Sequence, residues 1–317
     1  MTSPKVSIII LNWNGLEDTV ECLESLRKIT YPNYEVIVVD NDSEGNDAQV
    51  LEEKFGDYVR LIRNDKNYGY TGGNNIGIRY VADNSAPDYF LILNNDTIVA
   101  PDFLGQMIKV TESDDSIGIV GPKVYYYNFP NRIQSAGGKV NMRTGQASLT
   151  GIKEIDTGQY DTQQEVGYVF GCCLLIKKEV LQKVGLFDES YFCYWDEVDY
   201  CFRAREAGYK VVCIPEAKIW HKAPLKLKVW DKTPMGGKAS GLSYYYMARN
   251  NFKFMRKHAI KGQYRSFILY FLGYHFWFMT AVCLLYHRNV RRLFGFYRGV
   301  KDGLFNSTSG TKHYIEH

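Results

Sequence analysis

The stretch FLILNNDTIVAPDF, residues 90–103, places four apolar residues directly before Asn94, Asn95 and Asp96. A continuous apolar run of this kind is typical of a strand that is buried on both faces of a parallel sheet. In such sheets, ligands bind beyond the carboxyl ends of the strands. The polar triplet therefore predicts the edge of a binding crevice, with the alternative that it caps a helix that opens near Pro101.

The sequence around this stretch continues the same alternation. Strand-like apolar runs alternate with helical patterns, at residues 6–11, 16–27, 35–39, 50–55, 59–62, 74–82 and 89–93. This order predicts an α/β fold with a mostly parallel sheet that helices cover on both faces. Polar residues also follow the second and third strands, where Asp40, Ser43 and Asn67 stand. We expect these side chains to share one edge of the sheet with the triplet.

The helical pattern stops between residues 123 and 165. Glycines and turn residues at 137–138 and 143–145 predict short strands joined as a hairpin flap. Further along the chain we expect a strand at 172–176, a helix at 178–184, a second helix at 196–207 and a strand at 210–214.

Charged residues are distributed unevenly along the chain of 317 residues. Residues 1–220 carry a net charge of −11, whereas residues 221–317 carry +14. Such an asymmetry predicts an anionic partner for the tail, for example lipid headgroups, phosphates or nucleic acid. The alternative is a basic surface that is merely solvated.

The seven cysteines show neither C-x-x-C spacing nor pairing with histidine. They are typical of small buried residues in a reducing compartment, and they predict neither a disulfide framework nor a zinc site. The first residues, MTSPKVSIIILNWNG, predict a strand and not a signal peptide. We therefore expect a cytosolic location for the body of the protein.

An apolar segment at residues 266–287 contains no Lys, Arg, Asp or Glu. It is long enough to cross a bilayer. Because both flanks are basic and the segment is rich in aromatic residues, we favour a helix that lies in the membrane interface. A helix packed within the protein and a true membrane span are the alternatives.

Three parts of the sequence offer groups for chemistry. Side chains alternate along a strand, so Asn94 and Asp96 can together address a divalent cation or a phosphate. Asp196 and Glu197 begin a predicted helix, where the helix dipole favours their ionised forms at neutral pH, as a general base requires. His221 ends the run KVVCIPEAKIWH and can offer a metal a neutral imidazole. Helix capping is the alternative for the acids, and a structural role is the alternative for the histidine.

Some catalytic motifs do not occur. H-E-x-x-H, G-x-S-x-G, a G-K-[ST] loop and G-x-G-x-x-G are all missing from the sequence. This argues against hydrolases, P-loop enzymes and nicotinamide-dependent enzymes. The glycine-rich NYGYTGGNN, residues 67–75, precedes a helix and could let the backbone approach a diphosphate.

The ordered set VSIIILNWNG, VIVVDNDS, KNYGYTGGNN, LNNDT, WDEVD and IWH resembles the inverting glycosyltransferases of family 2, from about residue 5 to 225. The rhamnosyltransferase-like branch, with its galactofuranosyl relatives, is the most similar. The resemblance implies a GT-A fold over residues 1–225 and a basic helical extension over 226–317. It also implies transfer of a sugar from a nucleoside-diphosphate sugar, such as dTDP-rhamnose or a UDP-hexose, to a glycan or lipid-linked glycan in cell-surface polysaccharide or glycoconjugate synthesis.

The same resemblance implies roles for single residues. Glu197 would be the catalytic base, with Asp196 as the second choice, while Asp96 and His221 would bind Mg²⁺ or Mn²⁺. Asn94 stands where the first acid of the metal-binding motif is common. The nucleobase and ribose would contact Asp40, Asn12 and Ser43. The ribose and diphosphate would contact Asn67, Gly73, Asn74, Asn94 and Asn95, and Trp195 would stack on the acceptor sugar.

The tail motif YYYMARNNFKFMRKH and the later GFYRGVKDGL resemble the same branch. At helical spacing, Arg249, Lys253, Arg256 and Lys257 predict one basic face, on which Arg249 would contact a lipid-linked diphosphate acceptor. We therefore expect a cytoplasmic enzyme at the inner face of the cell membrane, in peripheral contact with anionic lipid and without a nucleic-acid partner.

Two other functions compete with this interpretation. A sugar-phosphate nucleotidylyltransferase would need a glycine-rich loop with Arg or Lys after the first strand, where this sequence has NWNGLEDT. A non-catalytic carbohydrate-binding protein on the same fold would not need a metal site that faces a base. A processive synthase is disfavoured because Q-x-x-R-W does not occur.

Overall fold

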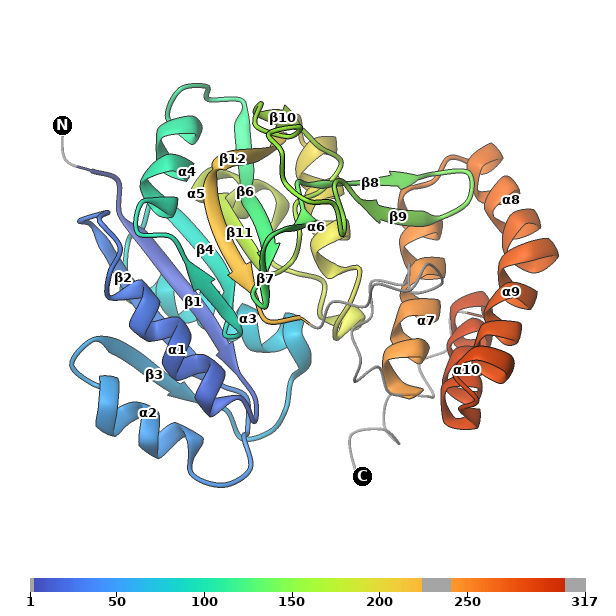
Figure 1. The fold of residues 1–317 in the computed structure, drawn as a ribbon, viewed down its shortest axis with the longest axis horizontal. Coiled ribbons are helices and arrows are strands. Elements are labelled where there is room, and N and C mark those ends of the chain that lie inside the picture. Colours follow the sequence, from blue (N-terminus) through green and yellow to red (C-terminus); the bar gives the residue numbers. More distant parts are fainter. Residues whose placement is uncertain (1–2, 224–240, 306–317) are drawn as a thin grey trace. The chain divides into compact units, whose positions relative to one another are not determined.

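The computed structural model describes residues 3–223 and 241–305 and divides into two compact units (Figure 1). Among the described residues, the first unit holds 3–139, 149–192 and 196–223. The second unit holds 140–148, 193–195 and 241–305. The domain boundary expected after residue 225 lies outside the described residues.

The first unit is built on a mixed sheet. Its strands are β1 (Val6–Asn12), β2 (Tyr34–Asp40), β3 (Val59–Arg63), β4 (Tyr89–Asn94), β5 (Thr97–Val99), β6 (Ile117–Tyr126), β7 (Phe129–Ser135), β10 (Gln164–Glu165), β11 (Cys173–Lys177) and β12 (Lys210–His221). The main order is β10-β12-β6-β11-β4-β1-β2-β3. The run from β4 to β3 is parallel, as is the pair of β6 and β12, whereas β11 runs antiparallel between β4 and β6. The predicted α/β fold with a mostly parallel central sheet is confirmed.

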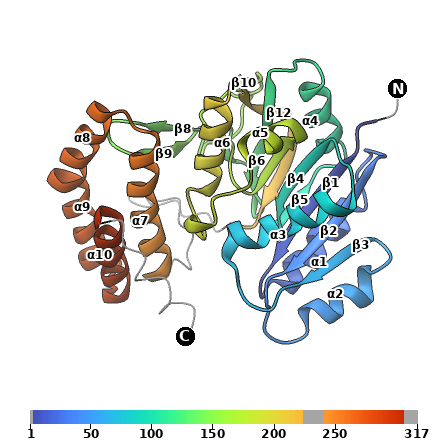
Figure 2. The same cartoon turned by 180° about the vertical axis from the view of Figure 1, so that it is seen from behind.

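Helices cover both faces of this sheet because apolar side chains leave each central strand on both sides. They are α1 (Leu16–Leu26), α2 (Asp47–Phe55), α3 (Gly69–Asn84), α4 (Phe103–Thr111), α5 (Lys178–Val184) and α6 (Asp196–Glu206). Ile8 and Ile10 belong to the core that α1 and α4 cover. Ile9 faces α3, where a Cβ on Gly77 would come within 2.6 Å of it. Figures 1 and 2 show α1 and α4 on one side and α3 and α6 on the other.

Strand β12 extends seven residues beyond the predicted end at residue 214. Its first part pairs with β6, and its last residues also pair with the short strand β5. In this register His221 lies opposite Thr97. The imidazole is therefore placed beside the polar triplet that ends β4.

The second unit is mainly helical. It holds α7 (Gly241–His258), α8 (Lys261–Tyr270), α9 (Phe276–Ala281) and α10 (Val290–Phe305), with π-helical turns at Phe271–His275 and Val282–Tyr286. The predicted hairpin is present as β8 (Gly138–Asn141) and β9 (Gln146–Leu149), and its tip belongs to this unit. Asn251 Nδ2 donates to the Gly145 carbonyl at 2.6 Å and so ties the tip to α7.

Glycines let α10 approach the backbone of α7. A Cβ on Gly299 would lie 2.3 Å from the Tyr245 carbonyl oxygen, and one on Gly295 would lie 1.9 Å from that of Gly241. Gly303, four residues further, meets the Phe252 side chain at 2.9 Å. Packing of α10 on α7 therefore explains the glycines of the motif GFYRGVKDGL, because only a hydrogen fits between the two helices at these positions.

The apolar segment forms one long helix over Lys261–Tyr286. Its 26 residues and hydropathy of 1.7 are sufficient to cross a membrane by length and composition. Only 17% of its most apolar part is buried. This low burial disfavours the alternative of a helix packed within the protein.

Candidate active site

A hydrogen-bonded cluster lies at the carboxyl ends of β1 and β2. The parallel register puts Asn12 beside Asp40. Asn12 Nδ2 donates to Asp40 Oδ2 at 2.8 Å and to Ser43 Oγ at 3.0 Å, while the Ser43 backbone N–H donates to Asp40 Oδ1 at 3.1 Å. The structure thus brings together the three residues expected beside the nucleobase and ribose. Asn12 and Asp40 are both buried.

Asn41 organises the next loop, which carries Asn67. Its side chain is buried and donates to Asn67 Oδ1 at 2.9 Å. Its own oxygen accepts from Asn64 Nδ2 at 2.9 Å and from the Tyr68 backbone N–H at 3.1 Å. The sequence analysis missed this role, because the partners lie more than 20 residues away and leave no local pattern.

Helix α3 follows, with Gly73 and Asn74 near its start. A Cβ on Gly73 would lie 2.4 Å from Leu11 Cδ1, so this glycine allows α3 to pack closely on β1. The structure therefore gives Gly73 a packing role, where we expected an approach to a diphosphate. Asn74 Nδ2 donates to the Tyr70 carbonyl at 2.9 Å, and its buried Oδ1 has no hydrogen-bond partner within the described parts of the chain.

Asp96 and His221 form a close pair at the end of β4. Asp96 Oδ1 lies 3.1 Å from His221 Nε2. On the other side of the ring, His221 Nδ1 lies 3.0 Å from the buried Gln134 Oε1, which can only accept a hydrogen bond. Nδ1 can donate to this oxygen, and Nε2 faces Asp96. This is the arrangement of a metal-ligating histidine with its outer partner.

Two further observations suit a divalent cation here. Asn94 Oδ1 is buried and has no hydrogen-bond partner within residues 3–223 and 241–305. Burial would raise the pKa of Asp96, yet His221 and Lys222 hold this pKa below its ordinary value, so the carboxylate stays charged. The described residues contain no group of three or more His, Cys, Asp or Glu side chains at one point. The donor set thus fits a hard cation that takes its remaining ligands from substrate phosphates and water.

Asn95 points away from this pair. Its Nδ2 donates to Thr19 Oγ1 at 2.9 Å and lies 3.5 Å from Asn12 Oδ1. The amide nitrogen expected to contact substrate is thus used within the protein, and it joins the triplet to the Asn12 cluster.

Glu197 and Asp196 begin α6. Burial raises the pKa of Glu197 to about 7, and burial together with the Glu197 charge raises the pKa of Asp196 well above its ordinary value. Both carboxyls are therefore harder to ionise than their place at a helix terminus alone predicts. The helix terminus favours the charged forms, but the loss of solvent outweighs it. A carboxyl that titrates near neutral pH is well matched to general base catalysis.

One short segment connects the acid–histidine pair with Glu197. The Phe170 ring contacts the His221 ring edge-on, with centroids 5.7 Å apart. A Cβ on Gly171 would lie 3.4 Å from Glu197 Oε1. The carbonyl of Cys172 accepts from the Asn94 backbone N–H at 2.9 Å. Three consecutive residues thus adjoin His221, Glu197 and the end of β4, so the structure gathers these groups at one edge of the sheet.

Asn75 fixes the chain that leads to α6. Its Nδ2 donates to the Phe187 carbonyl at 2.9 Å and to Glu189 Oε1 at 3.0 Å, and Arg79 pairs with Glu189 at 2.8 Å. Asn75 is fully buried. The motif NYGYTGGNN therefore also supports the segment before Asp196 and Glu197. No local pattern in the sequence reports this role, because the partners lie over 110 residues away.

Two of the residues expected to contact substrate have buried side chains. Trp195 is 6% exposed and packs on Phe254 with centroids 5.0 Å apart, so it offers no open stacking face. Arg249 is 7% exposed and lies over the Tyr246 ring at 4.8 Å. It therefore does not share an exposed basic face with Arg256 and Lys257, which are exposed.

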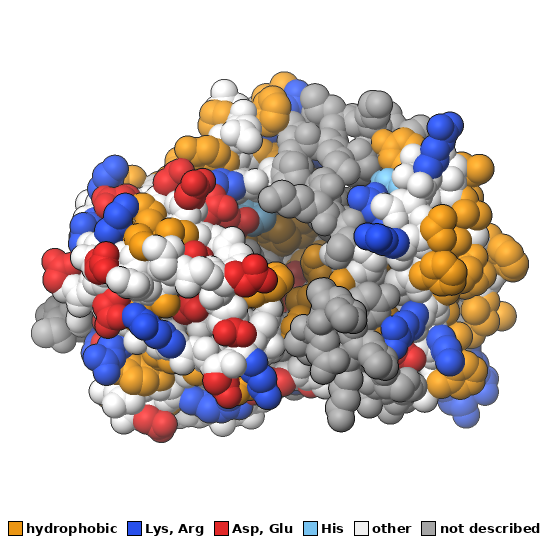
Figure 3. All heavy atoms as spheres, turned by 90° about the horizontal axis from the view of Figure 1, so that it is seen from below, with side chains coloured by type: hydrophobic (Ala, Val, Ile, Leu, Met, Phe, Trp, Pro, Cys, Tyr) orange, Lys and Arg blue, Asp and Glu red, His pale blue; other side chains and the backbone are white. Residues whose placement is uncertain are grey.

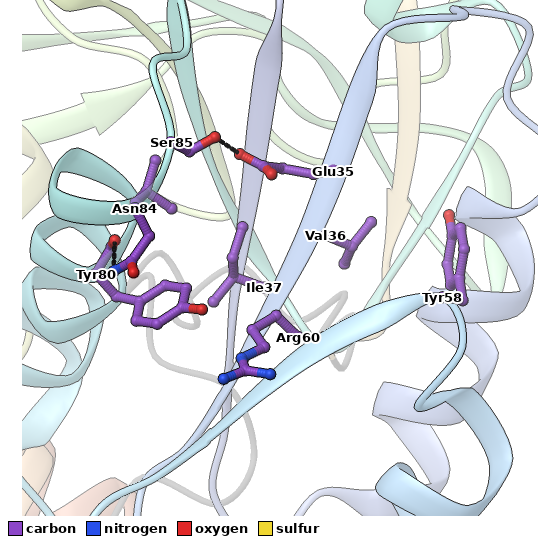
Figure 4. A pocket seen from close by; sticks show the side chains of 9 residues that line it. Glu35, Val36, Ile37, Tyr58, Arg60, Tyr80, Asn84 and Ser85 are labelled. Atoms are coloured by element: carbon purple, nitrogen blue, oxygen red, sulfur yellow. Dashed lines mark hydrogen bonds between the residues drawn. The ribbon is translucent and has the colours of Figure 1, made fainter.

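A cavity of about 210 Å³ lies elsewhere in the first unit (Figure 4). Its lining residues are Glu35, Val36, Ile37, Tyr58, Arg60, Tyr80, Val81, Asn84 and Ser85. Glu35 lies at the start of β2, whereas Asp40 ends that strand. The cavity is therefore at the opposite end of β2 from the residues gathered above.

The family assignment follows from the sequence and agrees with this geometry. Residues 7–185 match the family model described as Glycosyl transferase family 2, which is more than half of the chain. The chain belongs to glycosyl transferase family 2. The predicted family and enzyme class are thereby confirmed.

Curated relatives of this family 2 enzyme carry transferase names. The chain is 26% identical to the low-salt glycan biosynthesis hexosyltransferase Agl10 of Haloferax volcanii, over 69% of this chain and 68% of the relative. It is 26% identical to the dTDP-rhamnosyl transferase RfbF of Shigella flexneri, over 72% and 73%. It is 25% identical to the N-acetylglucosaminyl-diphospho-decaprenol L-rhamnosyltransferase of Mycobacterium tuberculosis, over 63% and 70%. These relatives support the rhamnosyltransferase-like branch. Two other relatives are much longer, and the chain spans 24% and 17% of their lengths.

A solved structure supports the GT-A fold. The mannosyltransferase PcManGT from Pyrobaculum calidifontis, in complex with GDP-Man and Mn²⁺, aligns with a TM-score of 0.56 at 14% identity. The alignment covers 97% of this chain and 89% of that chain. At this identity the likeness concerns the fold.

Proposed function

We propose that this family 2 glycosyltransferase is metal-dependent and inverting, with Asp96 and His221 as metal ligands and Glu197 as the base. The observation that carries the proposal is the gathering of two unlike acidic sites at one sheet edge. One is a carboxylate kept charged beside an imidazole, and the other is a half-buried carboxyl whose pKa is raised to about 7 by loss of solvent. With such a pair, one carboxyl can bind the metal ion while the other takes the proton.

The charged site suits a nucleoside diphosphate held through Mg²⁺ or Mn²⁺. Asp96 and His221 would bind the ion, and Asn94 Oδ1, which has no partner among the described residues, offers a third ligand. When bound, the ion neutralises the negative charge that grows on the departing diphosphate. The fold of this chain is shared with PcManGT, whose structure holds GDP-Man and Mn²⁺.

Glu197 performs the proton transfer in this proposal. Its carboxylate takes the proton from an acceptor hydroxyl as that oxygen forms a bond to the anomeric carbon. The bond from the anomeric carbon to the diphosphate oxygen breaks on the opposite face, so the configuration at this carbon inverts. Asn12, Asp40 and Ser43 hold the base and ribose of the donor, with Asn67 and Asn74 along the diphosphate.

The names of the relatives guide the choice of substrates. We infer a dTDP-rhamnose or UDP-hexose donor, in line with relatives named dTDP-rhamnosyl transferase and hexosyltransferase. For the acceptor we infer a glycan or a lipid-linked glycan, because one relative is named for a diphospho-decaprenol substrate. The product would enter cell-surface polysaccharide or glycoconjugate synthesis.

The second unit supports peripheral binding to anionic lipid at the inner face of the cell membrane. Its long helix exposes Leu269, Trp277 and Leu285 at 63% or more, and Arg288 and Arg291 nearby are exposed too. Figure 3 shows hydrophobic side chains gathered beside Lys and Arg in this part of the molecule. Apolar side chains next to cations match the chemistry of an anionic membrane surface.

Packing within the unit favours a helix that lies in the interface over one that spans. Phe267 and Phe271 pack on Phe252 of α7, with centroids 5.1 and 4.5 Å apart. Phe276 likewise packs on Phe296 of α10 at 5.8 Å. A spanning helix would have to carry two helices with charged residues into the hydrocarbon, which is costly.

A donor screen tests the proposed reaction. The full chain is incubated with dTDP-rhamnose, UDP-glucose and UDP-galactose, with Mn²⁺ or with EDTA, and release of the nucleoside diphosphate is measured. Release that needs the ion and one donor, and that is lost in Glu197→Gln, supports the proposal. Equal release in EDTA contradicts the metal dependence. Formation of a nucleoside triphosphate and a sugar 1-phosphate when pyrophosphate is added to the donor indicates a nucleotidylyltransferase. Binding of sugar without any release indicates the non-catalytic alternative.

Vesicle flotation tests the membrane contact. We expect the full chain to float with vesicles that contain phosphatidylglycerol and to stay at the bottom with phosphatidylcholine alone. Replacing Trp277 and Leu285 with serine should reduce flotation, because these side chains supply the exposed apolar area. A chain that ignores both kinds of vesicle contradicts this part of the proposal.

A further inference from the structure

The four residues before α6, Phe192 to Trp195, have an unusual backbone. Phe192, Tyr194 and Trp195 have φ angles of 65°, 66° and 69°. This left-handed region is sparsely populated by residues other than glycine, and bulky side chains rarely occupy it. Such a conformation persists only where the surrounding structure holds it in place. Trp195 is followed directly by Asp196 and Glu197, which form the first turn of α6.

Asn250 of α7 holds the middle of this segment. Its Nδ2 donates to the Cys193 carbonyl at 2.8 Å and to the Tyr194 carbonyl at 2.9 Å. Asn250 is fully buried, and its Oδ1 accepts from Arg249 Nε at 2.9 Å, which fixes the orientation of the amide. One side chain thus binds two successive carbonyls of a left-handed backbone.

The start of the segment is held separately. The Thr71 backbone N–H donates to the Phe192 carbonyl at 3.2 Å. A Cβ on Gly69 would come within 2.5 Å of the Phe192 ring, so the first turn of α3 lies close against this residue. The first unit thus holds Phe192, and the second unit holds the carbonyls of Cys193 and Tyr194.

We propose that Asn250 is a positioning residue for Glu197, acting through the backbone of residues 193–195. Two hydrogen bonds from one amide keep this backbone in its left-handed form, and the covalent chain passes that geometry to the first turn of α6. This inference rests on the proposed role of Glu197 as the base. It also gives the motif YYYMARNN a function, because the second unit then supplies a group on which turnover in the first unit depends.

Neighbouring positions on α7 provide matched variants. Asn250→Ala removes the amide, whereas Asn250→Asp keeps its shape and its bond from Arg249 but replaces the two N–H donors with an acceptor. Asn251→Ala is the control, since Asn251 is the next residue of the helix and its amide binds the Gly145 carbonyl at 2.6 Å instead. If Asn250→Ala does not fold, Asn250→Asp still decides the question.

The readouts separate positioning from general damage. We expect kcat to fall on the order of 100-fold in Asn250→Ala and Asn250→Asp, because a small misplacement of a reacting group has an effect of this size. Binding of the nucleotide sugar in the presence of Mn²⁺ should stay at the wild-type level. Hydrogen exchange followed by mass spectrometry should show faster exchange over residues 192–197 in both variants. Asn251→Ala should match the wild type in kcat and over this segment.

The outcomes distinguish this inference from the proposed function. Wild-type turnover in Glu197→Gln contradicts the role of the base, and the inference then falls with it. An inactive Glu197→Gln beside an Asn250→Asp with wild-type kcat overturns the inference alone. The same holds if exchange rises equally in the Asn250 and Asn251 variants, because the effect would then belong to α7 as a whole.

Discussion

Asp96 and Glu197 are two half-buried carboxyls at the same sheet edge, yet their surroundings move their pKa values in opposite directions. Asp96 lies 3.1 Å from the His221 imidazole and near the Lys222 ammonium, which keep its pKa below the ordinary value. Glu197 is half-buried and follows the buried Asp196, and loss of solvent raises its pKa to about 7. In the proposed mechanism, these surroundings, and not the residue type, suit one group to charge binding and the other to proton transfer.

The largest effect that would sharpen this contrast is expected for Glu197→Gln. Removing the proton acceptor should lower kcat roughly 10²–10⁴-fold, the usual contribution of a general base. Donor binding with Mn²⁺, followed by calorimetry, should stay unchanged because Asp96 and His221 remain. A variant that loses both turnover and donor binding would show that the two carboxyls do not have separate tasks.

Asp96→Ala should produce the opposite pattern, with a smaller effect. Nucleotide binding in Mn²⁺ is expected to weaken roughly 10–100-fold, since a charge-assisted contact to the ion is lost. In EDTA the variant and the wild type should bind alike. Asp96→Asn serves as the control for shape, because it keeps the side-chain volume but not the charge. Equal Mn²⁺ dependence in all three proteins would exclude Asp96 as a metal ligand.

Gln134→Leu tests how the histidine is oriented. Loss of the hydrogen bond to Nδ1 frees the ring to turn, and we expect the affinity for Mn²⁺ to fall about tenfold, as for other outer partners of metal ligands. Titration of Mn²⁺ at fixed nucleotide measures this. Turnover at saturating Mn²⁺ should recover, which distinguishes the variant from Glu197→Gln. An unchanged Mn²⁺ titration would mean that Gln134 has no part in orienting the imidazole.

The smallest effect concerns pH. The base works only when deprotonated, so kcat/KM should fall as the pH drops through the Glu197 pKa of about 7. The loss between pH 7 and pH 6 should be about fivefold for a single group that titrates at 7. Asp96 has a lowered pKa and therefore adds no second decrease to the pH profile of kcat/KM in this range. A rate that is flat down to pH 5 would contradict the raised pKa of Glu197.

The sequence was most informative where structure is local. The apolar run before Asn94 and the run before Asp40 correctly predicted two strand ends on one sheet edge, because burial on both faces leaves a continuous pattern. The pairing of His221 with the Asp96 region depends on β12 crossing to β5, a register that no local pattern reports. The family resemblance nevertheless predicted that Asp96, His221 and Glu197 act together.

Burial and distant hydrogen bonds account for what was missed. The raised pKa of Glu197 and the burial of Trp195 and Arg249 did not follow from the sequence, since each depends on neighbours from other parts of the chain. Asn75 and Asn250 look like ordinary helix residues in the sequence. Their importance appears only once the carbonyls that they bind, at Phe187 and at Cys193, are brought to them by the fold.

The glycines of α10 have a consequence for mutational tolerance. Gly295 and Gly299 leave less than 2.5 Å between an added Cβ and the carbonyls of α7, so even alanine would wedge the two helices apart. A saturation library should therefore accept only glycine at every fourth residue along this stripe, while the exposed Phe294 varies freely. The positions that tolerate no substitution would thus identify the residues of α10 that contact α7.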